Sequence, residues 1–110
     1  MIGIVERRPA WVPEPLFPFE SRFIELDGHH VHYLDEGQGP TLLLLHGNPT
    51  WSFYWRSIVG RFRDSHRVVV PDHLGMGLSD KPADADYGYT LRNRVQDLDR
   101  LLDSLGLQDG

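Results

Sequence analysis

The sequence predicts an α/β protein, on the strength of two observations. Residues 41–45 and 67–71 are apolar runs without alternation, which is typical of strands covered on both faces in a parallel sheet. Between them, residues 51–62 carry apolar side chains at helical spacing. Two strands joined through a helix imply a right-handed crossover and a parallel pair.

The composition limits the class of protein. The chain has 110 residues, 40% of them hydrophobic and 25% charged, which suits one small domain. A net charge of −5 argues against a nucleic-acid binder with a basic face, and no apolar run approaches the roughly 20 residues that span a bilayer. The N-terminus lacks the apolar core of a signal peptide, and cysteine is absent. We therefore expect a soluble, cytoplasmic protein without disulfides.

Residues 1–21 are expected to form an extended arm. Four of the eight prolines lie here: Pro9, Pro13, Pro15 and Pro18. Proline removes the donors that a helix or a central strand needs, yet Trp11, Phe17 and Phe19 are too apolar for a free linker. We expect the arm to pack across a larger body, formed by residues 22–110.

Residues 22–34 alternate between apolar and polar side chains around Asp27-Gly28. Asp-Gly between two alternating runs is a strong hairpin signal, because glycine accepts a positive φ. The polar stretch 35–40 is expected to end this hairpin before the strand at 41–45.

The loop and helix after the second apolar strand are also marked in the sequence. Residues 72–88 are rich in Gly, Asp and Pro, which predicts a long loop. Thr90 is the expected N-cap of a helix that ends at Gly106. The apolar stripe of this helix comprises Leu91, Val95, Leu98, Leu101, Leu102 and Leu105.

The first chemically informative segment lies where the strand at 41–45 passes into a helix. Backbone N–H groups at such a turn lie near the positive end of the helix and can stabilise a developing negative charge. Gly47 is expected to allow the sharp turn after His46, and Pro49 to stiffen it. A His-Gly turn in this position is where α/β-hydrolases place one oxyanion-hole donor, although an ordinary strand-to-helix turn is the structural alternative.

The loop at 72–88 contains a serine and several glycines that do not form known motifs. Ser79 is not a G-x-S-x-G nucleophile, since Lys81 stands where the last glycine would be, and the dinucleotide pattern fails at Asp80. We expect four residues to hold this loop by turn hydrogen bonds: Asp72, Gly75, Gly77 and Ser79.

Three histidines in the hairpin, His29, His30 and His32, suggest a metal site at first sight. His30 and His32 would share one strand face, but no third ligand has suitable spacing. We expect a solvated hairpin instead, with no metal and no other cofactor.

Two longer motifs resemble one family. They are His-Gly-Asn-Pro-Thr-Trp, which opens residues 46–56, and Pro-Asp-His-Leu-Gly-Met-Gly-Leu-Ser-Asp-Lys-Pro at 71–82. Together with the first 20 residues they resemble the α/β-hydrolase group of haloalkane dehalogenases, bacterial β-lactone decarboxylases of olefin synthesis and, more distantly, epoxide hydrolases. The resemblance covers essentially the whole chain. Asn after His-Gly is similar to the first two branches, whereas epoxide hydrolases more often carry Phe there.

The resemblance implies roles for the turn. The backbone N–H of Asn48 would help to form the oxyanion hole, and its side-chain amide would grip a leaving halide in a dehalogenase. The neighbours that would shape this site for a small-molecule substrate are His46, Gly47, Pro49 and Trp51. Because Asn also suits turns through bonds to its own backbone, a purely structural Asn48 remains the alternative.

The resemblance also implies that the chain is the N-terminal part of the fold, truncated before the nucleophile strand. Nucleophile, acid and base would then lie outside this chain, and the fragment itself would be inactive. The implied activity is haloalkane dehalogenation, with an Asp nucleophile forming an ester that His-activated water hydrolyses. The alternatives are a β-lactone (cis-3,4-dialkyloxetan-2-one) decarboxylase, an epoxide hydrolase or, in a different class, a non-catalytic docking module. The strand at 41–45 would leave an uncovered edge through which the fragment can self-associate.

Overall fold

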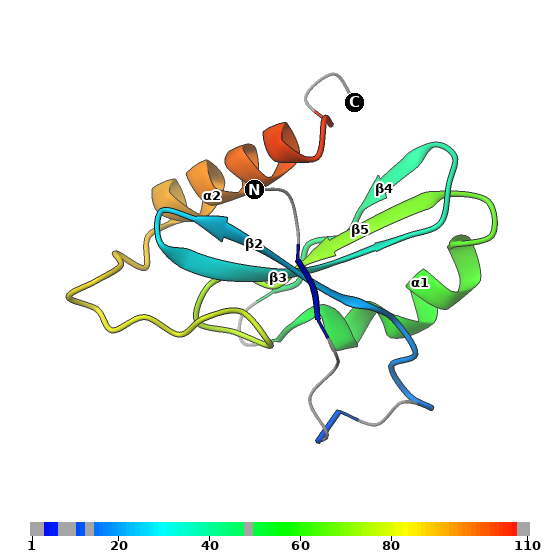
Figure 1. The fold of residues 1–110 in the computed structure, drawn as a ribbon, viewed down its shortest axis with the longest axis horizontal. Helices are drawn as coiled ribbons and strands as arrows, with labels where there is room; N and C mark the ends of the chain where they lie inside the picture. The colour runs from blue at the N-terminus through cyan, green and yellow to red at the C-terminus, as the bar shows by residue number, and fades with distance from the viewer. Residues whose placement is uncertain (1–3, 7–10, 13–14, 48–49, 108–110) are drawn as a thin grey trace.

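A computed structural model describes residues 4–6, 11–12, 15–47 and 50–107 of the chain. The strands of its single sheet are β1 (Ile4–Glu6), β2 (Ser21–Leu26), β3 (His29–Glu36), β4 (Thr41–Leu43) and β5 (Arg67–Pro71). The helices are the 3₁₀ turn η1 (Ser52–Trp55), α1 (Arg56–Phe62) and α2 (Leu91–Ser104). Figure 1 shows the sheet between α1 and α2, which lie on its opposite sides.

The sheet has the order β1-β2-β3-β5-β4. Its first four strands pair antiparallel, whereas β4 and β5 pair parallel, with Leu42 opposite Val68. The parallel pair is joined through η1 and α1, which confirms the predicted crossover and the α/β class.

The predicted hairpin is confirmed by the backbone at its turn. Asp27 has φ 52° and Gly28 has φ 81°, so both central residues are in the left-handed region that a two-residue type I′ turn requires. Leu26 and His29 face each other across the turn, which fixes the register of β2 against β3.

The two strands of the parallel pair differ in burial. In β5 the prediction of a strand covered on both faces is confirmed, since Val68, Val69 and Val70 are fully buried. In β4 it is wrong, because the strand is only three residues long, Thr41 is exposed and the leucines are half-buried. The reason is position: among the described strands, β4 pairs with β5 alone and forms the edge of the sheet.

The two helical predictions are confirmed in place and refined in form. The first stretch begins as η1 and becomes α-helical only at Arg56. The second, α2, is capped by the Thr90 Oγ1, which accepts the Asn93 N–H at 3.2 Å, and Gly106 follows it with φ 72°. Its apolar stripe is covered unevenly, because Leu101 is buried while Leu91 is 80% exposed.

Each face of the sheet has its own apolar cluster. The α1-face cluster joins the arm, the sheet and α1 through Val12, Phe17, Phe19, Leu34, Val59, Val68 and Val70. The α2-face cluster contains Ile24, Leu26, Val31, Tyr33, Leu74 and Leu101. Neighbours along β3 alternate between the two clusters, as the two-residue period of a strand requires.

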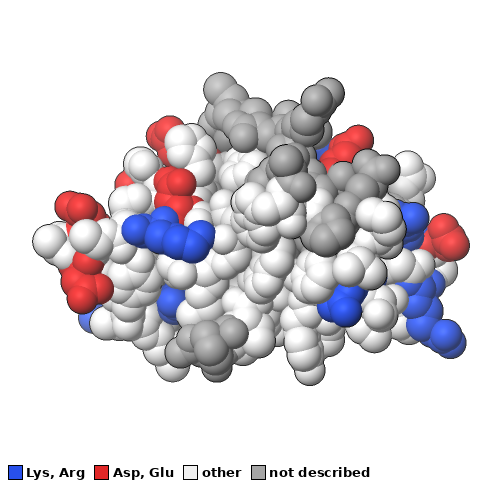
Figure 2. Space-filling model, turned by 90° about the horizontal axis from the view of Figure 1, so that it is seen from below, with Lys and Arg blue, Asp and Glu red and all other residues white. Residues whose placement is uncertain are grey.

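The surface on the α1 side is uncharged over most of its centre. Figure 2 shows Lys and Arg together with Asp and Glu near the two ends of this face, with uncharged residues between them. None of the helices in the described part of the chain has the length and apolar character needed to span a membrane.

Candidate functional site

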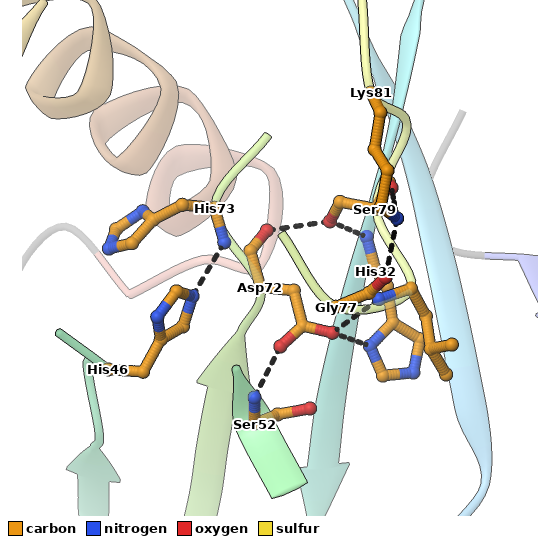
Figure 3. A network of polar contacts seen from close by, with 9 residues as sticks. His32, His46, Ser52, Asp72, His73, Gly77, Ser79 and Lys81 are labelled. Atoms are coloured by element: carbon orange, nitrogen blue, oxygen red, sulfur yellow. Dashed lines mark hydrogen bonds and ion pairs between the residues drawn. The ribbon is translucent and has the colours of Figure 1, made fainter. Parts of the chain in front are cut away.

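The candidate site lies where the carboxyl ends of the parallel strands β4 and β5 meet. Residues 44–52 follow β4, and the loop that begins at Asp72 follows β5. In open α/β sheets, ligands bind at the carboxyl ends of parallel strands, where connecting loops diverge. Figure 3 shows the polar contacts between these segments and β3.

His46 is nearly buried, with 5% of its surface exposed, and both ring nitrogens are engaged. Its Nε2 lies 3.0 Å from the backbone N of His73 and accepts that N–H (Figure 3). Its Nδ1 lies 2.7 Å from the carbonyl oxygen of Gly47 and therefore carries the proton. This ring holds the turn in place and has no free nitrogen with which to accept a proton from a substrate.

Gly47 lies at the start of the turn, and Thr50 closes over it. The backbone N–H and the side-chain hydroxyl of Thr50 both donate to the Gly47 carbonyl, at 3.2 and 2.8 Å. The φ of Gly47 is not positive, and among the described residues a Cβ there would meet nothing within 4 Å. Asn48 and Pro49, which carry the predicted oxyanion and stiffening roles, lie outside the described residues.

Trp51 packs against the α1-face cluster. Its ring stacks on Phe53 at 5.3 Å between centroids and lies 5.7 Å from Phe17 and 6.0 Å from Trp11 of the arm. The structure thus connects the turn to the N-terminal arm, a contact that the sequence did not reveal.

The loop after β5 is held as predicted. Ser79 Oγ donates to the Asp72 carbonyl at 2.6 Å and accepts the backbone N–H of His32 at 2.8 Å. Gly75 and Gly77 have φ 89° and 57°, and a Cβ on Gly77 would collide with the Asp72 carboxylate. The turn role of these residues is confirmed, and the buried, doubly bonded Ser79 is not placed as a nucleophile.

His32 contradicts the expectation of a solvated hairpin. It is fully buried, and its Nδ1 lies 2.8 Å from Oδ2 of the equally buried Asp72. The signal that could have found it is its position on β3 two residues before the core residue Leu34, because residues i and i+2 share a strand face. Distance along the sequence concealed its partner, which lies 40 residues away.

The other two hairpin histidines have ordinary surroundings. His30 Nδ1 lies 3.5 Å from an Asp80 carboxylate oxygen near the surface, and His29 packs edge-on against Tyr87. In the part of the chain that the structure describes, no group of three or more His, Cys, Asp or Glu side chains is placed to hold a metal ion.

A hollow of about 360 Å³ opens beside the turn, between β4, the loop after β5 and the first half of α2. Its wall is mainly apolar and includes Leu45, Gly47, Met76, Leu91, Val95 and Leu98. His73 and Arg94 supply its polar edge. Burial, and next the neighbouring His46, lower the pKa of His73 from 6.5 to about 4, so its ring is neutral at pH 7. The apolar wall suits a mainly apolar molecule, and Arg94 supplies a positive charge at its edge.

A comparison with protein families matches residues 40–109 to the alpha/beta hydrolase fold. Among curated proteins, a cis-3-alkyl-4-alkyloxetan-2-one decarboxylase from Shewanella oneidensis is 50% identical over 96 residues, covering 87% of this chain and 30% of the relative. A second decarboxylase of this name, from Xanthomonas campestris, is 53% identical over 101 residues, covering 84% and 34%. Haloalkane dehalogenase 2 of Mycobacterium tuberculosis is 46% identical over 98 residues, covering 88% and 34%. The chain thus spans about a third of the length of the curated relatives it matches.

Solved structures with a similar fold also match this chain. The haloalkane dehalogenase DatA from Agrobacterium tumefaciens superposes with a TM-score of 0.71 at 36% identity, covering 79% of this chain and 29% of that one. The wild-type protein Cfl2 from Burkholderia cenocepacia superposes with a TM-score of 0.72 at 34% identity, covering 80% and 30%.

Proposed function

Because this chain belongs to the alpha/beta hydrolase fold family, we propose that it is the N-terminal part of an enzyme that cleaves a small, mainly apolar substrate. The favoured substrate class is a cis-3-alkyl-4-alkyloxetan-2-one, a β-lactone that loses carbon dioxide to leave an alkene. The observation that carries this choice is the identity of 50% and 53% to two decarboxylases of that name. The apolar hollow beside the turn is in keeping with alkyl substituents.

Haloalkane dehalogenation is the second candidate. It is supported by 46% identity to a dehalogenase over a similar span and by the superposition on DatA. Both candidate substrates are small, uncharged and largely apolar, so they use the same kind of hollow. An epoxide hydrolase has less support, because the curated relatives described above are decarboxylases and a dehalogenase. A docking module has less support because these relatives are enzymes.

The proposed roles of the turn follow the resemblance. The backbone N–H of Asn48 is the oxyanion donor, and its side-chain amide stabilises a leaving halide in the dehalogenase case. His46, Gly47, Pro49 and Trp51 shape the surroundings of that donor. Support comes from the flanks, since Thr50 is bonded to Gly47 and His46 to the loop after β5.

The catalytic nucleophile, acid and histidine are proposed to come from segments outside residues 1–110. Ser79 and the His32–Asp72 pair are already committed to hydrogen bonds inside the protein. The enzyme is proposed to act without a cofactor, in the cytoplasm of a bacterium, on a small molecule.

A paired assay tests this proposal in the full-length protein that carries this chain. A cis-3,4-dialkyl β-lactone and a 1-bromoalkane are supplied separately, and alkene and bromide are measured. Rapid alkene release with bromide at background supports the decarboxylase, whereas bromide release above background with measurable halide affinity supports the dehalogenase. If the protein turns over neither substrate, the proposal is overturned.

The role of Asn48 is tested in the same assay by Asn48→Ala. This change removes the side-chain amide and keeps the backbone N–H that is the proposed oxyanion donor. In the dehalogenase case, loss of the amide should lower kcat for bromide release by about 10²–10³, as loss of one charge-stabilising donor typically does, and should weaken halide binding. Asn93→Ala is the matched control, because Asn93 donates to the Gly88 carbonyl on an exposed turn before α2. Equal bromide release by the two variants would remove the Asn48 side chain from the proposed site.

A further inference from the structure

Two consecutive residues after β5 hold the turn from both sides. The Asp72 Oδ1 accepts the backbone N–H of Ser52 at 2.5 Å, and the backbone N–H of His73 donates to His46 Nε2 at 3.0 Å. In Figure 3, His46 lies below His73 and Ser52 lies below the Asp72 carboxylate, each joined to its partner by a dashed line. Since residues 46 and 52 flank the turn, one short segment sets the separation of its two ends.

Asp72 accepts hydrogen bonds on both of its carboxylate oxygens. It is fully buried, and its Oδ2 accepts the Leu78 N–H at 3.0 Å as well as the proton on His32 Nδ1 at 2.8 Å. Together with Ser52, three donors from three separate segments converge on one carboxylate. A buried carboxylate is tolerated only when donors of this kind surround it, so its position is dictated by all three.

His32 is the one side chain among these three donors. Its backbone N–H is bonded to Ser79 Oγ, which in turn donates to the Asp72 carbonyl, and its own carbonyl accepts the Asp72 N–H at 2.8 Å. Together with the ring contact, β3 thus holds Asp72 through three links. The opposite ring nitrogen, Nε2, is buried and has no hydrogen-bond partner within the described structure. Within the described residues, the hydrogen bond to the Asp72 carboxylate is therefore the one that the ring makes, and the ring packs edge-to-face against Phe23.

We propose that Asp72 is a positioning residue for the turn, with His32 fixing its carboxylate and the backbone N–H of His73 holding the opposite flank. This inference rests on the proposed function, in which the turn carries the oxyanion donor. Such a donor acts only within a few tenths of an ångström of its place, and a displacement of about 1 Å can lower the rate by about 10²-fold. Asp72 touches no reacting atom and acts through Ser52.

The same two strands offer a matched control. Arg67 on β5 and Asp35 on β3 form a two-fold hydrogen-bonded ion pair, with contacts of 2.8 and 2.7 Å. Like the His32–Asp72 pair it joins β3 to β5, but it lies at the opposite end of β5, away from the turn. Asp35→Asn therefore weakens the same strand pair without releasing Ser52.

The experiment compares three changes in the full-length protein, using whichever substrate it turns over. Asp72→Asn places an amide donor among groups that already donate, and His32→Leu removes the donor at similar volume. We expect both to lower kcat about 10–100-fold with KM changed less than about threefold. His32→Asn, whose amide nitrogen can occupy the place of Nδ1, should restore kcat to within about threefold of wild type. Asp35→Asn should lower the melting temperature and leave kcat unchanged.

A purely structural role makes a different prediction. The folded fraction of Asp72→Asn and His32→Leu would then keep its kcat, and that result overturns the proposal. If Asp72→Asn does not fold, the comparison of His32→Leu with His32→Asn decides, and equal losses in these two overturn the role of His32.

A second measurement separates this proposal from the proposed function. Amide hydrogen exchange of a peptide covering residues 46–55 needs no substrate. It should be faster in His32→Leu than in Asp35→Asn, because only His32→Leu removes a donor that fixes the Asp72 carboxylate, to which the Ser52 N–H is bonded. If exchange is faster but neither substrate is turned over, the positioning role of Asp72 is supported and the proposed function is overturned. Equal exchange rates in the two variants overturn the positioning role of Asp72.

Discussion

The two faces of the sheet are completed to different degrees within this chain. On the α1 face, Phe17 and Phe19 of the arm pack with sheet and helix side chains into one buried cluster. On the α2 face, packing is complete near Leu101, while Leu91 and Val95 at the start of the same helix are 80% and 57% exposed. The exposed part borders the hollow beside the turn. The side of the sheet that carries the candidate site is thus the side that the chain leaves open.

This difference has a physical cause in the strands. β5 lies between β3 and β4, and its valines are covered from both faces. β4 has a neighbour on one side, so Leu45 just beyond it is 40% exposed. An apolar strand edge of this kind, without a charged side chain, is a template for pairing.

The largest expected effect is on the state of the isolated chain. Residues 1–110 expressed alone should self-associate through the β4 edge and the apolar hollow beside it. Light scattering after gel filtration should then give a mass above that of one chain, and Leu45→Lys should shift it toward the monomer. Leu16→Lys is the matched control, because Leu16 is 53% exposed on the arm. A monodisperse wild-type monomer with cooperative unfolding contradicts the prediction.

The next effect tests how tightly the α1 face is closed. Phe17 is fully buried and lies 5.3 Å from Phe19 and 5.6 Å from Phe53 between ring centroids. In the full-length protein, Phe17→Ala should lower the free energy of unfolding by about 3–5 kcal/mol, because a large cavity replaces the ring. Leu16→Ala, one residue earlier and exposed, should change it by less than about 0.5 kcal/mol. Urea denaturation measures both, and similar losses would show that the arm is not part of this core.

The local features of both faces could be predicted from the sequence, whereas the contacts between segments distant in the chain could not. The Asp27-Gly28 turn and the Thr90 cap were predictable, because each is decided by a few neighbouring residues. The half-burial of β4 does not follow from its apolar run, because burial depends on what lies beside a strand, and only the family resemblance indicated an uncovered edge. A pattern of apolar residues therefore predicts a strand better than it predicts its coverage.

The candidate site was also predictable in part. Its position, at a His-Gly turn after one strand and a Gly-rich loop after another, was predictable from the order of the elements. The link between them was not, since the Asp72–Ser52 and Asp72–His32 contacts join residues 20 and 40 positions apart. His32 among three hairpin histidines looked like a solvated residue, and only its strand face distinguished it.

Two glycines sharpen the comparison between the loop after β5 and the hairpin. Both Gly77 and Gly28 have positive φ, so an added side chain costs about 1–2 kcal/mol at either position. At Gly77 the new Cβ would also collide with the Asp72 carboxylate and lie 2.7 Å from Trp51 Cβ, whereas at Gly28 nothing lies within 4 Å. Gly77→Ala should therefore destabilise the full-length protein by about 1–3 kcal/mol more than Gly28→Ala. Equal melting temperatures would mean that the loop shifts to make room.

The smallest effect concerns His73, at the border between the closed and the open face. Burial and the neighbouring His46 lower its pKa to about 4, against 6.5 in an unfolded chain. Between these values the unfolded chain binds a proton that the folded protein does not. The contribution of His73 to stability is therefore present above pH 6.5, falls as the pH is lowered from 6.5 to about 4, and declines no further below that.

His73→Gln isolates this contribution, because it removes the titrating ring and keeps the backbone N–H that binds His46. Urea denaturation midpoints of the wild type and of His73→Gln at pH 7.0, 5.5 and 4.5 measure it. The effects of carboxylates that titrate in the same range cancel when the two proteins are compared. Since the ring is only half-buried, water screens the effect, and we expect the wild type to lose on the order of 1 kcal/mol more than the variant between pH 7.0 and 4.5. Parallel losses would show that water reaches His73 freely from the hollow. A larger difference in the full-length protein than in residues 1–110 would show that further chain covers the open face.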